Sequence, residues 1–275
     1  MNNLQIVTQF LSLPQEISDT IRTGFSVGEL ALLAGIIEGK YKYLSENNQA
    51  IQKLLNRQFI VNKEGEYKLV NSHKFICNYI VFYRDTIDPD KIPVFDEFFS
   101  REMSQHNVKT YEQIKDYIKK AEGHWVIPCV CRVFHNNCDN PKKICMGLVK
   151  DYEYEGAERL SLEKALKIAE KSEENNLVPT YFDMTDGGGW LCFCCGCCCM
   201  PIRKFLRTGE GTVASGFIQY TSMEECAACG DCVAACQFSA RMITDDELIV
   251  DDKLCLGCGV CIDDCPSEAI SLVSR

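Results

Sequence analysis

The chain has 275 residues, a formal net charge of −10 at pH 7 and 19 cysteines, and 46% of its residues are apolar. This composition supports buried cores in about two domains and excludes a disordered or low-complexity chain. The apolar run between Glu29 and Glu38 is too short to span a membrane, and the first residues lack the basic segment of a signal peptide. We therefore expect a cytoplasmic protein without a membrane span, in a reducing compartment.

Residues 1–109 form the first predicted domain, a helical module with a single cysteine, Cys77. Residues 14–70 predict three helices and a short strand pair that turns at Lys63–Glu66, an order that resembles a winged-helix fold. Residues 1–123 carry 15 Lys and Arg against 16 Asp and Glu, and the third helix offers only Lys53 and Arg57. A DNA-binding face needs a basic surface, so nucleic acid is disfavoured as a partner and a docking or structural role is expected. Cys77 is expected to be a buried structural residue.

Two further helices are predicted around the middle cysteines. Residues 110–122 begin with a capping box formed by Thr110 and Gln113. Residues 161–177 begin at Ser161, a predicted N-cap, and place apolar residues at helical spacing, namely Leu162, Ala165, Leu166 and Ala169. We assign this second helix a structural role.

Ten cysteines fall in the second predicted domain, residues 110–215, in two groups. The first group is Cys129, Cys131, Cys138 and Cys145, and the second is Cys192, Cys194, Cys195, Cys197, Cys198 and Cys199. In an extended backbone, alternate side chains point to opposite faces. Cys129 and Cys131 would then share a face, whereas Cys194 and Cys195, like Cys197 and Cys198, would point apart. The second group can therefore serve two different sites.

Closely spaced cysteines in a reducing compartment indicate metal sites, because most of these thiols are too near in sequence to form unstrained disulfides. With only four histidines in the chain, ligation by thiolates alone favours iron–sulfur clusters or all-cysteine zinc. We expect one or two Fe–S clusters in this domain. The predicted ligands are Cys129, Cys131, Cys138 and Cys145, joined or exchanged with Cys192, Cys194, Cys195 and Cys198. A zinc site and free or catalytic thiols remain alternatives, and His135 is either a ligand or an ordinary hydrogen-bonded histidine.

The third predicted domain, residues 216–275, contains a tandem C-x2-C-x2-C-x3-C repeat whose two copies are 29 residues apart. This spacing resembles the bacterial two-cluster ferredoxins, in which the fourth cysteine of each run binds the other cluster. The resemblance implies one [4Fe-4S] cluster on Cys226, Cys229, Cys232 and Cys265, and a second on Cys255, Cys258, Cys261 and Cys236. Gln237 stands where the pattern expects proline, and residues 242–252 predict a hairpin between the runs. Two all-cysteine zinc knuckles are the alternative.

The whole layout predicts an α+β protein with a helical N-terminal module, a cysteine-rich middle domain and a ferredoxin-like tail. It resembles a family of prokaryotic multi-cysteine 4Fe-4S-binding proteins, in which a C-x-C-R segment precedes a C-x-C-C run and a two-cluster ferredoxin domain. The matching residues are Cys129–Arg132, Cys138, Pro141, Cys145 and Cys192–Cys195.

Three functions fit this layout. The first is electron transfer in anaerobic metabolism, relaying low-potential electrons through several clusters to or from a partner oxidoreductase. The second is an iron–sulfur reductase, in which a catalytic middle cluster acts on a small-molecule substrate. The third is a redox-sensing DNA-binding regulator. Residues 124–275 carry 14 Lys and Arg against 23 Asp and Glu, which favours a basic redox partner over nucleic acid.

Overall fold

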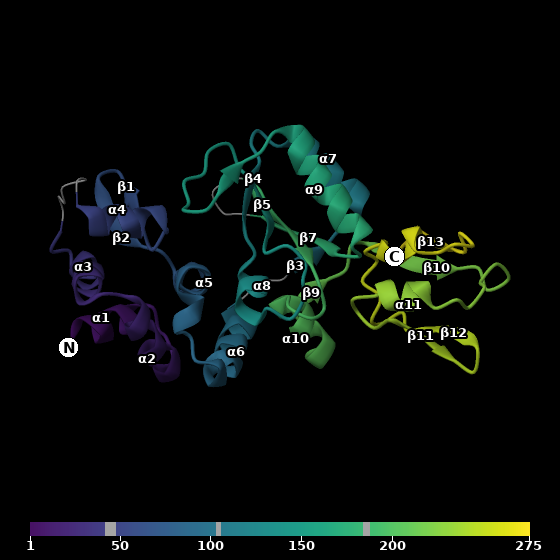
Figure 1. Ribbon diagram of the computed structural model, residues 1–275, viewed down its shortest axis with the longest axis horizontal. Helices are drawn as coiled ribbons and strands as arrows, with labels where there is room; N and C mark the ends of the chain where they lie inside the picture. The colour runs from purple at the N-terminus through teal and green to yellow at the C-terminus, as the bar shows by residue number, and fades with distance from the viewer. Residues whose placement is uncertain (42–47, 103–105, 184–187) are drawn as a thin grey trace. The chain divides into compact units, whose positions relative to one another are not determined.

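The computed structural model describes residues 1–41, 48–102, 106–183 and 188–275. It divides into two compact units, residues 1–102 with 153–156, and residues 103–152 with 157–275 (Figure 1). Both contain helices and strands, which confirms the predicted α+β class. No helix in these described ranges is long and apolar enough to cross a membrane.

The first unit contains the predicted succession of helices and a strand pair. The hairpin turns at Glu64 and Gly65, whose φ angles of 55° and 88° match the left-handed geometry of a tight two-residue turn. Its two strands pair antiparallel. The elements are α1 (Asn3–Phe10), α2 (Gln15–Gly24), α3 (Val27–Ile37), α4 (Gln49–Asn56), β1 (Ile60–Lys63), β2 (Glu66–Leu69), α5 (Ser72–Tyr83) and α6 (Ile92–Glu102).

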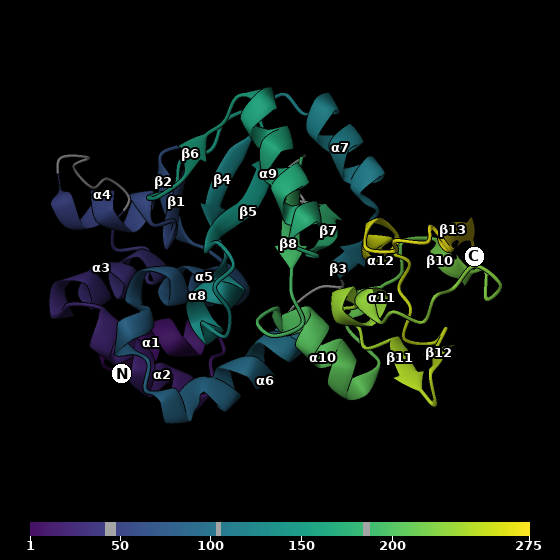
Figure 2. The ribbon, with the colours of Figure 1, turned by 45° about the vertical axis from the view of Figure 1, so that its right-hand side comes forward.

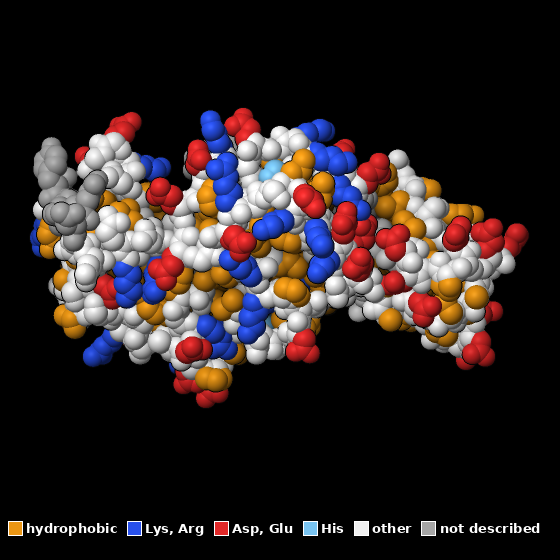
Figure 3. Space-filling view, turned by 45° about the horizontal axis from the view of Figure 1, so that its top comes forward, with side chains coloured by type: hydrophobic (Ala, Val, Ile, Leu, Met, Phe, Trp, Pro, Cys, Tyr) orange, Lys and Arg blue, Asp and Glu red, His pale blue; other side chains and the backbone are white. Residues whose placement is uncertain are grey.

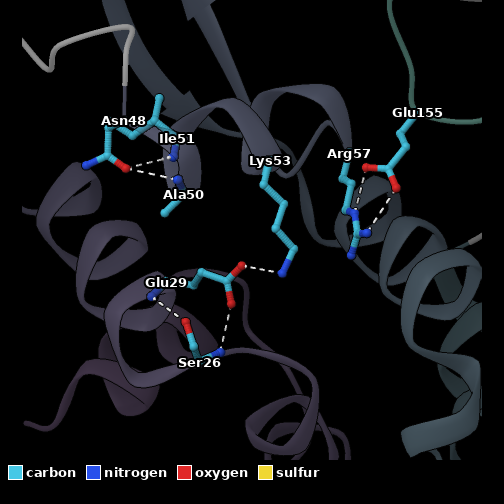
Figure 4. A network of polar contacts seen from close by, with 8 residues as sticks. All are labelled: Ser26, Glu29, Asn48, Ala50, Ile51, Lys53, Arg57 and Glu155. Atoms are coloured by element: carbon cyan, nitrogen blue, oxygen red, sulfur yellow. Dashed lines mark hydrogen bonds and ion pairs between the residues drawn. The ribbon is translucent and has the colours of Figure 1, made fainter.

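Both cations of helix α4 are engaged in ion pairs within this unit (Figure 4). Lys53 Nζ lies 2.7 Å from a carboxylate oxygen of the buried Glu29, which also caps helix α3 with Ser26. Arg57 binds Glu155 in a two-pronged arrangement, with N–O distances of 2.8 and 2.9 Å. The two side chains that the sequence offered for phosphate contacts therefore already have anionic partners.

Aromatic side chains form the core of the first unit. The ring of Phe59 lies 4.9 Å from those of Phe25 and Phe75, centre to centre. The hydroxyl of the buried Tyr79 donates a hydrogen bond to the carbonyl oxygen of Thr20. Burial raises the pKa of Cys77 to about 12, so this thiol stays protonated and inert.

The second unit is built on a seven-stranded sheet with the strand order β6-β4-β5-β8-β7-β3-β9. Neighbouring strands are antiparallel except β3 and β9, which are parallel. The strands are β3 (His106–Val108), β4 (Trp125–Pro128), β5 (Lys143–Leu148), β6 (Glu158–Arg159), β7 (Val178–Asp183), β8 (Gly189–Cys194) and β9 (Thr212–Val213). Strand β3 places residues 106–108 in this unit, although the first predicted domain ran to residue 109.

Four helices accompany the sheet. They are α7 (Tyr111–Lys120), α8 (Val130–His135), α9 (Leu162–Glu174) and α10 (Met200–Thr208). Helices α7 and α9 pack against each other along the sheet, as Figure 2 shows. Thr110 and Gln113 form the predicted capping box, and Ser161 caps α9. Leu162 is 44% exposed, so the apolar face of α9 rests on Ala165 and Ala169 instead.

The C-terminal segment belongs to the same unit. Strands β10 (Phe217–Thr221) and β13 (Ile270–Ser274) pair antiparallel, and β11 (Arg241–Thr244) and β12 (Glu247–Val250) form the predicted hairpin. Two short helices, α11 (Asp231–Ala235) and α12 (Val260–Asp263), follow the cysteine runs. Phe238 and Leu256 share one buried core with Val108 and Ile202 of the sheet region. The segment is therefore continuous with the sheet, without a separate unit beginning at residue 216.

Candidate metal centres

The eight C-terminal cysteines line two separate cavities. One, of about 320 Å³, is lined by Cys226, Cys229, Cys232 and Cys265. The other, of about 390 Å³, is lined by Cys236, Cys255, Cys258 and Cys261. Each cavity thus takes three cysteines from one run and the fourth from the other, which is the crossed arrangement implied by the resemblance.

The backbone of this segment makes the close approach to each cavity possible. Gly230 and Gly259 precede helices α11 and α12 with φ angles of 87° and 83°, which a residue with a Cβ adopts only with strain. Gly257 has a φ of 66°, and an added Cβ would lie 2.0 Å from the carbonyl oxygen of Phe217. The two cavities, with four thiols each and an apolar lining, fit the size and donor set of cubane clusters.

A buried arginine lies beside both C-terminal cysteine sets. Arg241 is 4% exposed, and its Nη1 atom lies 3.6 Å from Cys232 Sγ of the first set. Burial lowers the pKa of its guanidinium, but the sulfur atoms of Cys261 and Cys232 outweigh this effect and raise the pKa. Arg241 therefore brings a fixed positive charge to both sites.

Six of the ten middle cysteines form one buried group. Hydrogen bonds between neighbouring thiols link them in a closed ring, in the order Cys129, Cys131, Cys199, Cys194, Cys192 and Cys145. Hydrogen bonds from the flanking thiols hold the pKa of Cys129 and of Cys194 well below the usual range. The buried His106 completes this six-thiol group, because its ring nitrogen lies within 4.8 Å of Cys194 and Cys199 Sγ.

The other four middle cysteines form a second, compact group. The Sγ atoms of Cys138, Cys195, Cys197 and Cys198 all lie within 4.8 Å of one another. Cys138 comes from the loop after helix α8, and the other three come from the turn between β8 and α10. We refer to these residues as the four-thiol group.

The structure distributes the predicted ligands differently from the sequence groups. Cys138 joins the second cysteine run, apart from Cys129, Cys131 and Cys145. The expectation that Cys197 and Cys198 point apart is wrong, because residues 196–198 form a turn and strand alternation stops at Cys194. Cys194 and Cys195 do lie in different groups.

Three residues of these groups were absent from the predicted ligand set, namely Cys197, Cys199 and His106. The thiol count of the second run was the only sequence signal for the first two. His106 reaches the group from β3, which is more than 80 positions earlier in the chain, and no local pattern indicates it. His135 is not among the residues that the structure gathers into either described group.

A second buried arginine contacts both middle groups. Arg132 is 2% exposed and donates hydrogen bonds to the carbonyl oxygens of Phe193 and Pro141 at 2.7 and 3.2 Å. Burial lowers its pKa, but the sulfur atoms of Cys129 and Cys195 outweigh this effect and raise it. A buried guanidinium requires nearby negative charge, and thiolates supply that charge here.

The six-thiol group and the second C-terminal cavity share one hydrophobic core. Cys194 and Cys199 are buried in the same cluster of side chains against which Cys236 and Cys258 pack. Gln237 joins the two regions, because its Oε1 atom accepts a hydrogen bond from the Gly196 amide at 2.8 Å and its Nε2 atom donates to the Asn176 carbonyl oxygen. The glutamine in place of proline thus has a role in holding these regions together.

Acidic side chains cover the C-terminal segment. Residues 216–275 contain eleven Asp and Glu against three Lys and Arg. Figure 3 shows many of the acidic groups at its right-hand end, where this segment lies, and most of the basic groups over the rest of the visible face. The negative field is therefore concentrated near the two C-terminal cavities.

These features define an iron–sulfur protein. Residues 225–270 match the family model of the 4Fe-4S dicluster domain, which confirms the predicted two-cluster tail. Two relatives from Archaeoglobus fulgidus are similar to part of the chain. The indolepyruvate oxidoreductase subunit IorA is 34% identical over 72 residues, 26% of this chain and 11% of that protein. An iron–sulfur-type relative, a subunit of tetrathionate reductase, is 31% identical over 86 residues, 28% of this chain and 41% of that protein. The chain thus covers less than half of either relative, and no solved structure matches it.

Proposed function

We propose that this chain is a multi-cluster electron carrier that passes single electrons between its C-terminal clusters and a further cluster in the six-thiol group. The observation that carries this proposal is the shared core of Cys194, Cys199, Cys236 and Cys258. Electron tunnelling falls steeply with distance, so a continuous, water-free contact between two cluster sites favours transfer between them.

The ligand assignment follows from the cavities. Cys226, Cys229, Cys232 and Cys265 bind one [4Fe-4S] cluster, and Cys236, Cys255, Cys258 and Cys261 bind the second. Four of the six-thiol residues bind the additional cluster. Arg132 stabilises its negative charge from one side, because the guanidinium is buried beside Cys129.

The partner in this proposal is a basic oxidoreductase subunit. The acidic C-terminal segment would attract a positively charged surface and speed the encounter at low ionic strength. Both relatives are named as subunits of oxidoreductases, which supports a role beside a catalytic partner.

The test is an iron and acid-labile sulfide count on anaerobically purified protein, combined with EPR of the reduced form. We expect about 12 iron and 12 sulfide per chain in three cubane clusters. The double variant Cys192→Ser and Cys194→Ser should lose about four of each, while the control Cys77→Ser loses none. A count of about eight iron that the double variant leaves unchanged would refute the additional cluster.

Transfer between the sites has its own readout. When the second C-terminal cluster and the middle cluster are both reduced, their unpaired spins should broaden each other's EPR signals. Cys258→Ser, which removes a ligand of the second C-terminal cluster, should abolish this broadening and leave the middle signal sharp. Identical middle-cluster signals in the two proteins would contradict the proposed relay.

The composition of the six-thiol group favours a reductase as the second candidate function. Six thiols exceed the four that a cubane needs, and His106 lies beside Cys194 and Cys199. A thiol and an imidazole next to a cluster could deliver protons to a bound substrate. Perturbation of the middle-cluster EPR signal by a small ligand such as cyanide would favour this function, since it requires an accessible iron.

A further inference from the structure

The four-thiol group has the dimensions of a site for one metal ion. Cys138 Sγ lies 3.9 Å from Cys195 Sγ and 3.7 Å from Cys198 Sγ, and Cys197 Sγ lies 3.8 Å from Cys198 Sγ. Four thiolates arranged as a regular tetrahedron about 2.3 Å from a zinc ion have sulfur–sulfur edges of about 3.8 Å. The observed separations match the edges of such a tetrahedron.

The C-terminal sites of the same chain provide an internal comparison. Their cysteines surround cavities of about 320 and 390 Å³. In the part of the chain that the structure describes, no three sulfur atoms of either C-terminal set come within 4.8 Å of one another. Each thiolate of a cubane binds a different iron atom, so its sulfur atoms stay further apart. The four-thiol group is too compact for this geometry.

Hydrogen-bond donors surround the sulfur atoms of the group. The backbone amide of Asn137 donates to Cys198 Sγ at 3.3 Å, and Asn140 Nδ2 donates to Cys138 Sγ at 3.6 Å. Asn137 Nδ2 and Arg203 Nη1 both donate to the carbonyl oxygen of Cys197 at 3.1 Å and hold the turn in place. Burial raises the pKa of Cys138, but the hydrogen bonds from Asn140 outweigh it and bring the pKa to about 7. Such donors stabilise thiolates bound to a metal.

The charge balance agrees with a bound thiolate centre. Arg132, at 2% exposure, is close enough to Cys195 to hydrogen-bond its sulfur atom. A divalent ion with four thiolates carries a net charge of −2, which the buried guanidinium offsets in part. Four neutral thiols would leave this cation with less compensation at the same place.

We propose that Cys138, Cys195, Cys197 and Cys198 bind a single metal ion in a tetrahedral all-thiolate site, separate from the iron–sulfur clusters. Zinc is the expected ion, because four protein thiolates close the coordination shell, as in structural zinc sites. The ion ties the loop of Cys138 to the turn between β8 and α10. That turn also carries Cys194 and Cys199, so the single-ion site positions the six-thiol group next to it.

The test is metal analysis and zinc-edge X-ray absorption on the anaerobically purified full chain. We expect about one zinc per chain, with four sulfur neighbours at about 2.3 Å. The variant Cys138→Ser with Cys197→Ser should lose this zinc. Its C-terminal EPR signals should stay as in the wild type, which shows that the fold is intact, and Cys77→Ser is the matched control.

The outcomes separate the alternatives without depending on the proposed electron carrier. One iron per chain without accompanying sulfide, lost in the double variant, would support the same single-ion site with iron in place of zinc. Loss of about four iron and four sulfide in the double variant would overturn the proposal in favour of a cluster. A zinc content of zero, or zinc with nitrogen or oxygen neighbours, would also overturn it, and the absorption measurement needs no variant.

Discussion

Replacing Arg241 should lower the reduction potentials of the C-terminal clusters. Its guanidinium is 4% exposed, and Nη1 lies 3.6 Å from Cys232 Sγ. The positive charge favours the reduced, more negative cluster over the oxidised one. Arg241→Gln removes this charge and keeps a polar side chain near Gln219 and Thr221, to which Arg241 Nη2 now donates hydrogen bonds. An added electron therefore becomes harder to accept.

The magnitude follows from the distance. A unit charge 3.6 Å from the sulfur contributes about 4.6 kcal/mol at an effective dielectric constant of about 20. The added electron is spread over the whole cluster, so about half of this, roughly 2 kcal/mol, acts on it. For a one-electron couple, about 59 mV corresponds to 1.4 kcal/mol, so we expect a decrease of about 90 mV.

The assay is an anaerobic redox titration followed by EPR, with iron content as the check that both clusters remain. Arg241→Lys keeps the charge and should shift the potentials by less than half as much. The set nearer to Arg241, which contains Cys232, should respond at least as strongly as the other. If Arg241→Gln left both potentials unchanged or raised them, the electrostatic role assigned to this residue would be refuted.

Three further results are expected. Cys265→Ser should remove about four iron, although Cys226, Cys229 and Cys232 remain, because the fourth ligand comes from the other run; an unchanged iron content would contradict the crossed ligation. Gln237→Pro should keep all the clusters but lower the free energy of unfolding by about 1 kcal/mol, through lost hydrogen bonds to Gly196 and Asn176; equal thermal stability would argue against this contact. The Cys77 thiol should react with iodoacetamide only slowly at pH 8 and faster toward pH 12, since burial raises its pKa to about 12, and mass spectrometry of the native protein measures this profile.

The C-terminal sites could be predicted because their geometry is largely local. Three thiols at fixed spacing follow a short wrapped loop, and the left-handed glycines Gly230 and Gly259 are visible in the sequence. The fourth ligand of each set followed from the family resemblance. Helix caps such as Thr110 with Gln113 were predictable for the same reason, since donor and acceptor are three residues apart.

The middle sites show where the sequence stopped being sufficient. Ten thiols were evident, but their division into six and four depends on which strands lie side by side. Cys145 and Cys192 meet because β5 and β8 pair, and His106 arrives on β3 at the other side of β7. Strand alternation failed at Cys197 because it holds only while the backbone stays extended.

The sequence by itself thus determined the chemistry of this protein, namely thiolate ligation of iron–sulfur clusters, since ligand type and short-range spacing are written along the chain. The tertiary structure decided which thiols share a site and which site adjoins the C-terminal clusters. Such contacts join residues tens of positions apart, as when Gln237 meets Gly196. They arise from burial of a common core, which no local pattern in the chain specifies.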